Sequence, residues 1–237
     1  MAASTLLKLT NDVLRHFNEV ELTSTTLGTA VGFHSAVIDY VNDAIRDISQ
    51  TEKQWPFNWA EAEVTLVPGQ ADPQLYALES LAETVDWQTF TLVRDDTLDI
   101  KEKPLVYLEY DDWYKTHRAT DKDQVGTTLG IQPPKYVFRT KNSEFGVSPI
   151  PDRAYKVRYE YWTYAVDLAA HDDTSTIDAR FDNVIKKGAL ASCYHFRQNA
   201  EVGNTYEKKF RKGVLDMREL LINHDLKTRD TRTGRSG

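Results

Sequence analysis

Cysteine is almost absent from this chain, since Cys193 is the only one among 237 residues. A single cysteine excludes an internal disulfide framework and a cysteine-rich zinc cluster, so the fold must rest on packing and hydrogen bonds. No apolar run approaches the roughly 18 residues that a membrane span needs, and the first 20 residues are too polar for a secretory signal. These absences predict a protein that stays in a reducing cytosol, with no membrane among its partners.

Basic residues are outnumbered by acidic ones. The chain has 29 Lys and Arg against 36 Asp and Glu, which gives a formal net charge of -7. A protein that grips nucleic acid through a basic surface gathers Lys and Arg there, so this balance argues against that mode while allowing DNA to pass nearby. Ordinary solubility is the simpler explanation of the acidity. With 41% hydrophobic residues, the chain is expected to form one or two folded domains.

Motifs for catalysis and cofactor binding are missing as well. The sequence has no Gly-x-Ser-x-Gly, no P-loop and no Gly-x-Gly-x-x-Gly, so serine hydrolysis and nucleotide use have no support. Cys193 and His195 would diverge by about 200° on a helix and would not share a metal. The remaining histidines are scattered: His16, His34, His117, His171 and His224. We therefore predict no metal, no cofactor and no enzymatic activity.

Two pairs of adjacent carboxylates, Asp111-Asp112 and Asp172-Asp173, could hold a cation or act as an acid and base. Each pair lies just before a predicted helix. Helix capping and a favourable interaction with the helix dipole explain both pairs more simply.

Helical periodicity marks the beginning of the chain. The first helix has Ser4 as a candidate N-cap, and a polar stretch over residues 23–32 separates it from the second. The two apolar stripes are Leu6, Leu9, Val13, Leu14 and Phe17, then Phe33, Val37, Tyr40, Val41, Ala44, Ile45 and Ile48. Each helix needs a partner for one face.

The same periodicity returns near the end. One helix has its stripe at Phe181, Val184, Ile185, Gly188, Ala189, Ser192 and Phe196, and a last helix over about 201–224 has Tyr206, Phe210, Val214, Met217, Leu220 and Leu221. The small residues Gly188, Ala189, Ala191 and Ser192 would let a neighbouring helix approach closely.

Between these helical ends the period changes to two after Trp55-Pro56-Phe57. Strands are predicted over residues 60–67, 85–93, 105–110, 135–140, 144–147 and 155–164, with one short helix over 111–118. The last strand alternates aromatic with charged residues, which favours a half-buried antiparallel sheet.

The order of elements predicts an α+β protein in which the N- and C-terminal helices form one bundle and an antiparallel β domain is inserted between them. The predicted boundaries are 1–54 with 172–225 for the helical bundle, 55–171 for the inserted domain and 226–237 for an extended C-terminal tail.

Several segments together resemble a known family. They are the opening helix from Leu6 to Arg15, the second helix ending at Ala44-Ile45-Arg46-Asp47-Ile48, and the Trp55-Pro56-Phe57 exit into strands. In the later half, residues 145–152 lead into the strand 155–162, and Asp178-Ala179-Arg180-Phe181 opens a helix. From about residue 6 to residue 221 the chain resembles the tail tubular protein A and head-to-tail adaptor family of short-tailed bacteriophages.

This resemblance implies a structural virion protein at the head-tail junction, assembled in the host cytoplasm. It implies a ring of 12 copies that joins the portal protein to the tail nozzle or tail tube protein. The bundle would face the portal and the β domain would face the tail. Genomic DNA would pass through the lumen without specific binding, so the protein would do no chemistry on it.

The C-terminal tail is locally basic, because Lys227, Arg229, Arg232 and Arg235 outnumber Asp225 and Asp230. We expect it to act as a portal-binding strap, ordered on the portal or between adjacent subunits by charge-assisted hydrogen bonds. A disordered end is the simpler alternative.

Two other functions stay open. The first is a nucleic-acid-binding factor that uses the basic tail and an aromatic strand, with Tyr155, Tyr159, Tyr161, Trp162 and Tyr164 as a stacking platform. Sheet core and subunit packing explain these aromatics better, because only Lys156 and Arg158 lie close by. The second is a carbohydrate- or peptidoglycan-active enzyme with two carboxylates, which lacks a distinctive acidic pair.

Overall fold

The computed structural model describes residues 3–68, 75–95, 101–124 and 132–222. The chain divides into two compact units. One unit is 59–163, and the other combines residues before 59 with residues after 163. Strands fill the first unit and long helices the second, which confirms the α+β class with strands inserted between helices.

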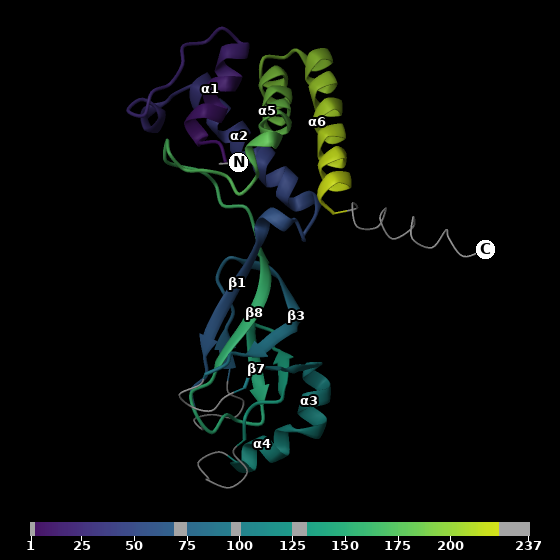
Figure 1. The fold of residues 1–237 in the computed structure, drawn as a ribbon. Coiled ribbons are helices and arrows are strands. Elements are labelled where there is room, and N and C mark those ends of the chain that lie inside the picture. Colours follow the sequence, from purple (N-terminus) through teal and green to yellow (C-terminus); the bar gives the residue numbers. More distant parts are fainter. Residues whose placement is uncertain (1–2, 69–74, 96–100, 125–131, 223–237) are drawn as a thin grey trace, which may run out of the picture. The chain divides into compact units, whose positions relative to one another are not determined.

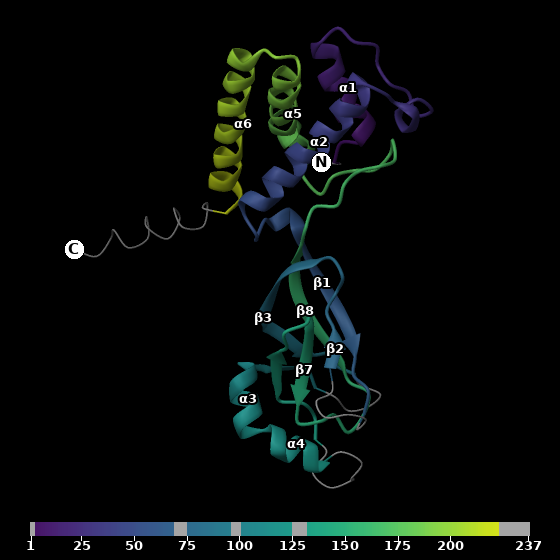
Figure 2. The ribbon, with the colours of Figure 1, turned by 180° about the vertical axis from the view of Figure 1, so that it is seen from behind.

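The helical unit contains α1 (Leu6–His16), α2 (Phe33–Thr51), α5 (Asp182–Phe196) and α6 (Ala200–Leu221). α5 packs against both α2 and α6, while α1 packs against α2 and α5. Both views show α6 beside α5 (Figures 1 and 2). All four helices contribute to one buried core, which includes Leu14, Val37, Ile45, Ile185 and Met217. Leu220, which the sequence assigns to the apolar stripe of the last helix, is half exposed instead.

The start of α1 differs from the expected one. Thr5, rather than Ser4, is the N-cap, because its side-chain oxygen accepts a hydrogen bond from the backbone N–H of Lys8. Ser4 donates instead to Asp182 Oδ2, which also accepts from Lys8 Nζ at 2.9 Å. These contacts tie the beginning of α1 to the beginning of α5.

The segment before α2 includes a short 3₁₀ helix, η1 (Leu27–Thr29). It reaches α2 through Gly32, whose φ of 61° lies in the left-handed region. Glycine is the residue that takes this conformation without a steric penalty, so it suits this abrupt entrance into the helix.

Close helix packing around α5 depends on glycines. A Cβ atom on Gly188 would lie 2.8 Å from Ala44 Cβ of α2 and 3.0 Å from the Phe210 ring of α6. A Cβ on Gly213 of α6 would lie 3.0 Å from Val184. The predicted role of the small residues in close helix approach is therefore confirmed for Gly188.

Residues 164–171, which the sequence assigns to the β domain, lie in the helical unit. Asn42 on α2 holds them there: its Nδ2 donates to the Leu168 carbonyl, and its Oδ1 accepts from the Leu168 N–H, each at 3.0 Å. Leu168 is buried in the helical core. The side-chain amide of Asn42 thus replaces a strand partner for this segment. Two further 3₁₀ helices, η2 (Pro56–Asn58) and η3 (Ala179–Phe181), also belong to this unit.

The β unit contains two four-stranded sheets that share one core. One sheet has the order β1 (Trp59–Thr65), β8 (Lys156–Thr163), β3 (Ala82–Leu92), β4 (Lys103–Pro104). The other has the order β2 (Leu75–Ala77), β7 (Glu144–Ser148), β6 (Tyr136–Arg139), β5 (Val106–Leu108). Aromatic rings join the sheets, since Phe145 of β7 lies 5.1 Å from Phe90 of β3 and 5.9 Å from Tyr159 of β8 between ring centroids.

One strand pair departs from the expected antiparallel pattern. β5 and β6 are parallel, whereas the other pairs among the described strands are antiparallel. Parallel neighbours need a crossover connection. Here the chain passes through α3 (Tyr110–Thr116) and α4 (Arg118–Gln124), so two short helices stand where the sequence predicts one.

A buried carboxylate fastens this crossover to the sheet. Asp121 of α4 accepts hydrogen bonds from Trp113 Nε1 at 2.8 Å and from Ser148 Oγ at 3.1 Å. The Trp113 ring stacks on Phe138 with 4.0 Å between ring centroids. Polar groups that are buried in this way stabilise a fold only when they are paired, as these are.

The buried thiol of Cys193 gives a direct test of the helical core. Cys193 is fully buried, and burial raises its pKa to about 12, so the thiol stays protonated at neutral pH. We expect Ellman's reagent to find no reactive thiol in the native protein and one per chain in guanidinium chloride. Rapid native labelling would contradict the packing of α5.

Candidate functional site

An aromatic cluster closes one end of the helical bundle. Phe17 lies just after α1, Phe33 begins α2, and Tyr194 and Phe196 lie in the last turn of α5. Phe33 lies 5.4 Å from Phe17 and 6.0 Å from Phe196 between ring centroids. The Arg197 guanidinium stacks over the Phe17 and Phe33 rings, at 4.6 Å and 4.1 Å. The cation and the rings thus hold the ends of three helices together.

His16 extends this cluster to α6. Its Nε2 lies 3.1 Å from the Tyr194 hydroxyl and 3.3 Å from the Tyr206 hydroxyl, and these two tyrosine rings stack on each other. Burial, and secondarily the charge of Lys186, lowers the pKa of His16. A neutral imidazole is therefore favoured in this position.

Apolar side chains around this aromatic cluster face solvent. Val20 is 79% exposed, Val31 is 80% exposed and Phe196 is 55% exposed. Val20 is held near the start of α2, because its carbonyl lies 3.0 Å from His34 Nε2. We call the exposed Val20, Val31 and Phe196, together with the half-buried Phe33, the bundle tip. Exposed apolar residues that form one patch are typical of protein interaction surfaces.

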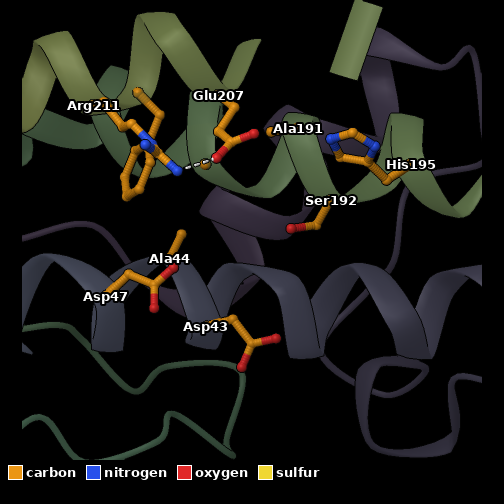
Figure 3. Close-up of a pocket in the computed structure, with 10 residues that line it drawn as sticks. Asp43, Ala44, Asp47, Ala191, Ser192, His195, Glu207 and Arg211 are labelled. Carbon is orange, nitrogen blue, oxygen red and sulfur yellow. Dashed lines mark hydrogen bonds and ion pairs between the residues drawn. The ribbon is translucent and has the colours of Figure 1, made fainter. Parts of the chain in front are cut away.

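A second candidate surface is a groove of about 220 Å³ between α2, α5 and α6 (Figure 3). Small residues of α5, among them Ala191 and Ser192, form its floor, and α2 and α6 form its walls. We call it the three-helix groove; it is lined by Asp43, Ala44, Asp47, Gly188, Ala191, Ser192, His195, Glu207, Phe210 and Arg211.

The charges of the three-helix groove are unevenly compensated. Glu207 and Arg211 form an ion pair along α6, and Asp43 pairs with Arg46 at 2.8 Å. Asp47 has no hydrogen bond or ion pair from its carboxylate to any residue that the structure describes. Burial, and secondarily the Asp43 carboxylate, raises the pKa of Asp47. The α2 wall therefore has room for an added positive charge.

The two acidic pairs singled out in the sequence lie in different local settings. Asp111 and Asp112 lie in the first turn of α3, where the helix dipole favours them, while the N-cap is Glu109. Asp173 caps a turn rather than a helix: the N–H groups of Ala170 and Ala169 donate to it and lower its pKa. The N-cap of η3 is Asp178.

The aromatic strand contributes to the core of the β unit. Tyr155, Tyr159 and Tyr161 are buried, whereas Trp162 is half-buried and Tyr164 is exposed. Tyr159 stacks on Phe90, and its side chain is fully buried. Three of the five rings are thus unavailable as a stacking platform for bases.

The predicted absence of a metal site and of a membrane span concerns residues in the helical unit and beyond. Cys193 is buried and His195 is exposed, and no group of three or more potential metal ligands occurs in the part of the chain that the structure describes. No helix in that part is both long and apolar enough to span a membrane. The tail residues Lys227, Arg229, Arg232 and Arg235 lie outside the described residues.

Sequence reasoning identified neither the bundle tip nor the groove. In the aromatic cluster beside the bundle tip, Phe17, Phe33 and Phe196 belong to apolar stripes that the sequence shows, whereas Tyr194 and Arg197 belong to none. Their position at helix ends is the available signal, because aromatic residues at several helix ends can meet when the helices align.

Comparison with known proteins adds one finding. The family model described as SU10 adaptor protein matches residues 4–236, nearly the whole chain. No curated protein matches the chain.

Proposed function

The chain belongs to the SU10 adaptor protein family, which makes it a structural adaptor of a phage and a component of the virion, and we propose that it acts at the head-to-tail junction. There it forms a ring, with 12 copies as the proposed number, that joins the portal protein to the tail nozzle or tail tube protein. The ring encloses the channel through which DNA leaves the capsid. Subunits assemble in the host cytoplasm.

The observation that carries this proposal is the family match from residue 4 to residue 236, which includes both structural units. We propose that the helical unit faces the portal and the β unit faces the tail. The close α2–α5–α6 packing and the two-sheet core suit a structural role, because each unit is held by a continuous core.

The bundle tip supports the helical unit as the portal-binding side. A partner that covers Val20, Val31 and Phe196 would remove their apolar surface from water. Such burial stabilises a contact by roughly 25 cal/mol per Å² of apolar surface. In a ring, each copy presents the same patch, so a modest contact is repeated around the junction.

Passage of DNA sets a different requirement for the lumen. Strong attraction would hold the DNA in place, so we expect the inner wall of the ring to be acidic or mixed in charge. The net charge of -7 agrees with this expectation. A continuous lining of Lys and Arg in the assembled ring would contradict it.

Portal docking by the bundle tip can be tested with Val31→Asp. The side chain is 80% exposed, so the variant should fold normally, but burying the new charge in the contact should weaken capsid attachment at least about tenfold. The measurement is retention of nuclease-protected DNA by portal-bearing capsids that lack the adaptor, after addition of purified protein. Leu215→Asp, on an exposed position of α6, is the matched control and should restore retention. If both variants restored DNA retention equally, the bundle tip would not be part of the portal contact.

The alternative function is a nucleic-acid-binding factor that uses the basic tail and the aromatic strand. Binding of that kind weakens steeply with salt because Lys and Arg displace counterions from phosphates. A gel-shift series distinguishes the two functions. The adaptor should show almost no DNA affinity at physiological salt, whereas tight salt-dependent binding would favour the alternative.

A further inference from the structure

The three-helix groove has the shape and charge of a site for an extended peptide. Its floor is made of small side chains, so a backbone can approach α5 closely between the α2 and α6 walls (Figure 3). Asp43 and Asp47 stand on the α2 wall, where Asp47 has no ion pair among the described residues. A lysine or arginine that entered the groove would supply the charge that this wall lacks.

The chain itself contains a segment of matching charge. Residues 223–237 carry four basic and two acidic side chains, in a protein whose overall charge is -7. The segment begins where α6 ends, and α6 is one wall of the groove. The family match extends to residue 236, so this segment is part of the adaptor sequence itself.

The length of the segment suffices to reach the groove. Arg211 lies ten residues before the end of α6 at Leu221, which corresponds to about 15 Å along the helix axis. Five extended residues span about 16 Å, so a chain that turns back at Ile222 reaches the level of Arg211, which lines the same groove as Asp47 and Asp43, by residue 227.

From this charge complementarity and reach, we infer that the three-helix groove binds the C-terminal segment of its own chain in the free protein. Lys227 and Arg229 pair with Asp47 and Asp43, and the tail backbone lies over Ala191 and Ser192. The contact keeps the basic tail from binding other acidic partners before assembly. A portal-bound tail must leave the groove, so groove and portal compete for it.

Cross-linking of the purified full-length protein tests this inference without portal or capsid, so its outcome is independent of the proposed ring. The test variant combines Ser192→Cys in the groove floor with Thr228→Cys in the tail. Cys193 stays outside the reaction because it is buried. The matched control combines Thr228→Cys with Thr205→Cys, an exposed position of α6 that does not line the groove.

At low salt and micromolar protein, the groove pair should form an intramolecular disulfide at least about tenfold faster than the control pair, because docking raises the effective concentration of the tail thiol. Salt at 0.5 M should reduce the difference, since it screens the charges. Reversing Asp43 and Asp47 to lysine should slow the reaction, and adding Lys227→Asp and Arg229→Asp should restore it.

Two results would overturn the inference. Equal rates for the groove pair and the control pair would mean that the tail does not occupy the groove. A disulfide that links two chains, and that persists on dilution, would mean that the groove takes the tail of another copy.

Discussion

Ile45→Asp is expected to unfold the helical unit. Ile45 is 3% exposed in the core that α2 shares with α1, α5 and α6. The substitution leaves a carboxylate without a partner in an apolar site, and such changes cost more than about 4 kcal/mol of unfolding free energy. Thermal melting followed by circular dichroism should show loss of the cooperative helical transition. Phe181→Asp is expected to act in the same way from the η3 side of the core.

The matched control is Leu220→Asp, the same kind of change on the exposed face of α6. Leu220 is 51% exposed, so the free energy of unfolding should change by no more than about 1 kcal/mol. If Ile45→Asp melted like the control, the N- and C-terminal helices could not share one core.

Deletion of residues 227–237 is expected to leave folding intact and to prevent attachment to the portal. The deletion removes none of the residues that form the helical core of the described chain, and ion pairs with the solvent-accessible Asp43 and Asp47 stabilise a fold only slightly, so the melting temperature should stay nearly unchanged. Attachment to portal-bearing capsids should be lost or strongly weakened, because Arg229, Arg232 and Arg235 would no longer supply charge-assisted hydrogen bonds. Ordering the tail costs about 1–2 kcal/mol per residue in backbone entropy, so only contacts repeated around a ring would hold it.

A full-length variant in which these three arginines are changed to glutamine keeps the length of the tail and removes its positive charge. It therefore shows whether the charge or the length is needed for attachment. It should fail to retain DNA in capsids as the deletion does. If the truncated protein completed DNA-retaining heads as well as the full-length protein, the portal-binding strap would be wrong.

The helices were predictable because amphipathic periodicity is local. The apolar stripe from Phe33 to Ile48 predicts α2. The small residues around Gly188 predict the close approach of a neighbouring helix, although they do not say which helix it is. Helix ends were harder to predict. Ser4 and Thr5 are both good N-caps, and the choice of Thr5 depends on Asp182, which is distant in sequence and binds Ser4 instead.

The strand positions were also largely predictable, but their pairing was not. Alternation along residues 155–161 identifies a strand with one buried face, yet it does not say which strand lies beside it. The parallel β5–β6 pair follows from the α3–α4 crossover, which is held by Asp121 contacts with Trp113 and Ser148. Such long-range polar contacts leave no periodic signal.

The candidate surfaces were the least predictable part. The three-helix groove takes its lining from three helices between residue 43 and residue 211, so no local motif marks it. The bundle tip likewise depends on distant residues meeting in space, since Phe33 and Phe196 lie 163 positions apart in the sequence and pack together beside Phe17. The resemblance seen in the sequence did indicate the phage adaptor family. It did so because the order and spacing of several segments are informative together, although no single motif is specific.

The central proposal, that this adaptor joins portal to tail as a ring, is tested most directly by negative-stain imaging of the purified protein with and without purified portal. The proposal predicts closed rings of one size, with about 12 subunits, stacked coaxially on one face of the portal around an open channel. Folded protein that remains monomeric in the presence of portal, or that binds it without rotational symmetry, would contradict the proposal.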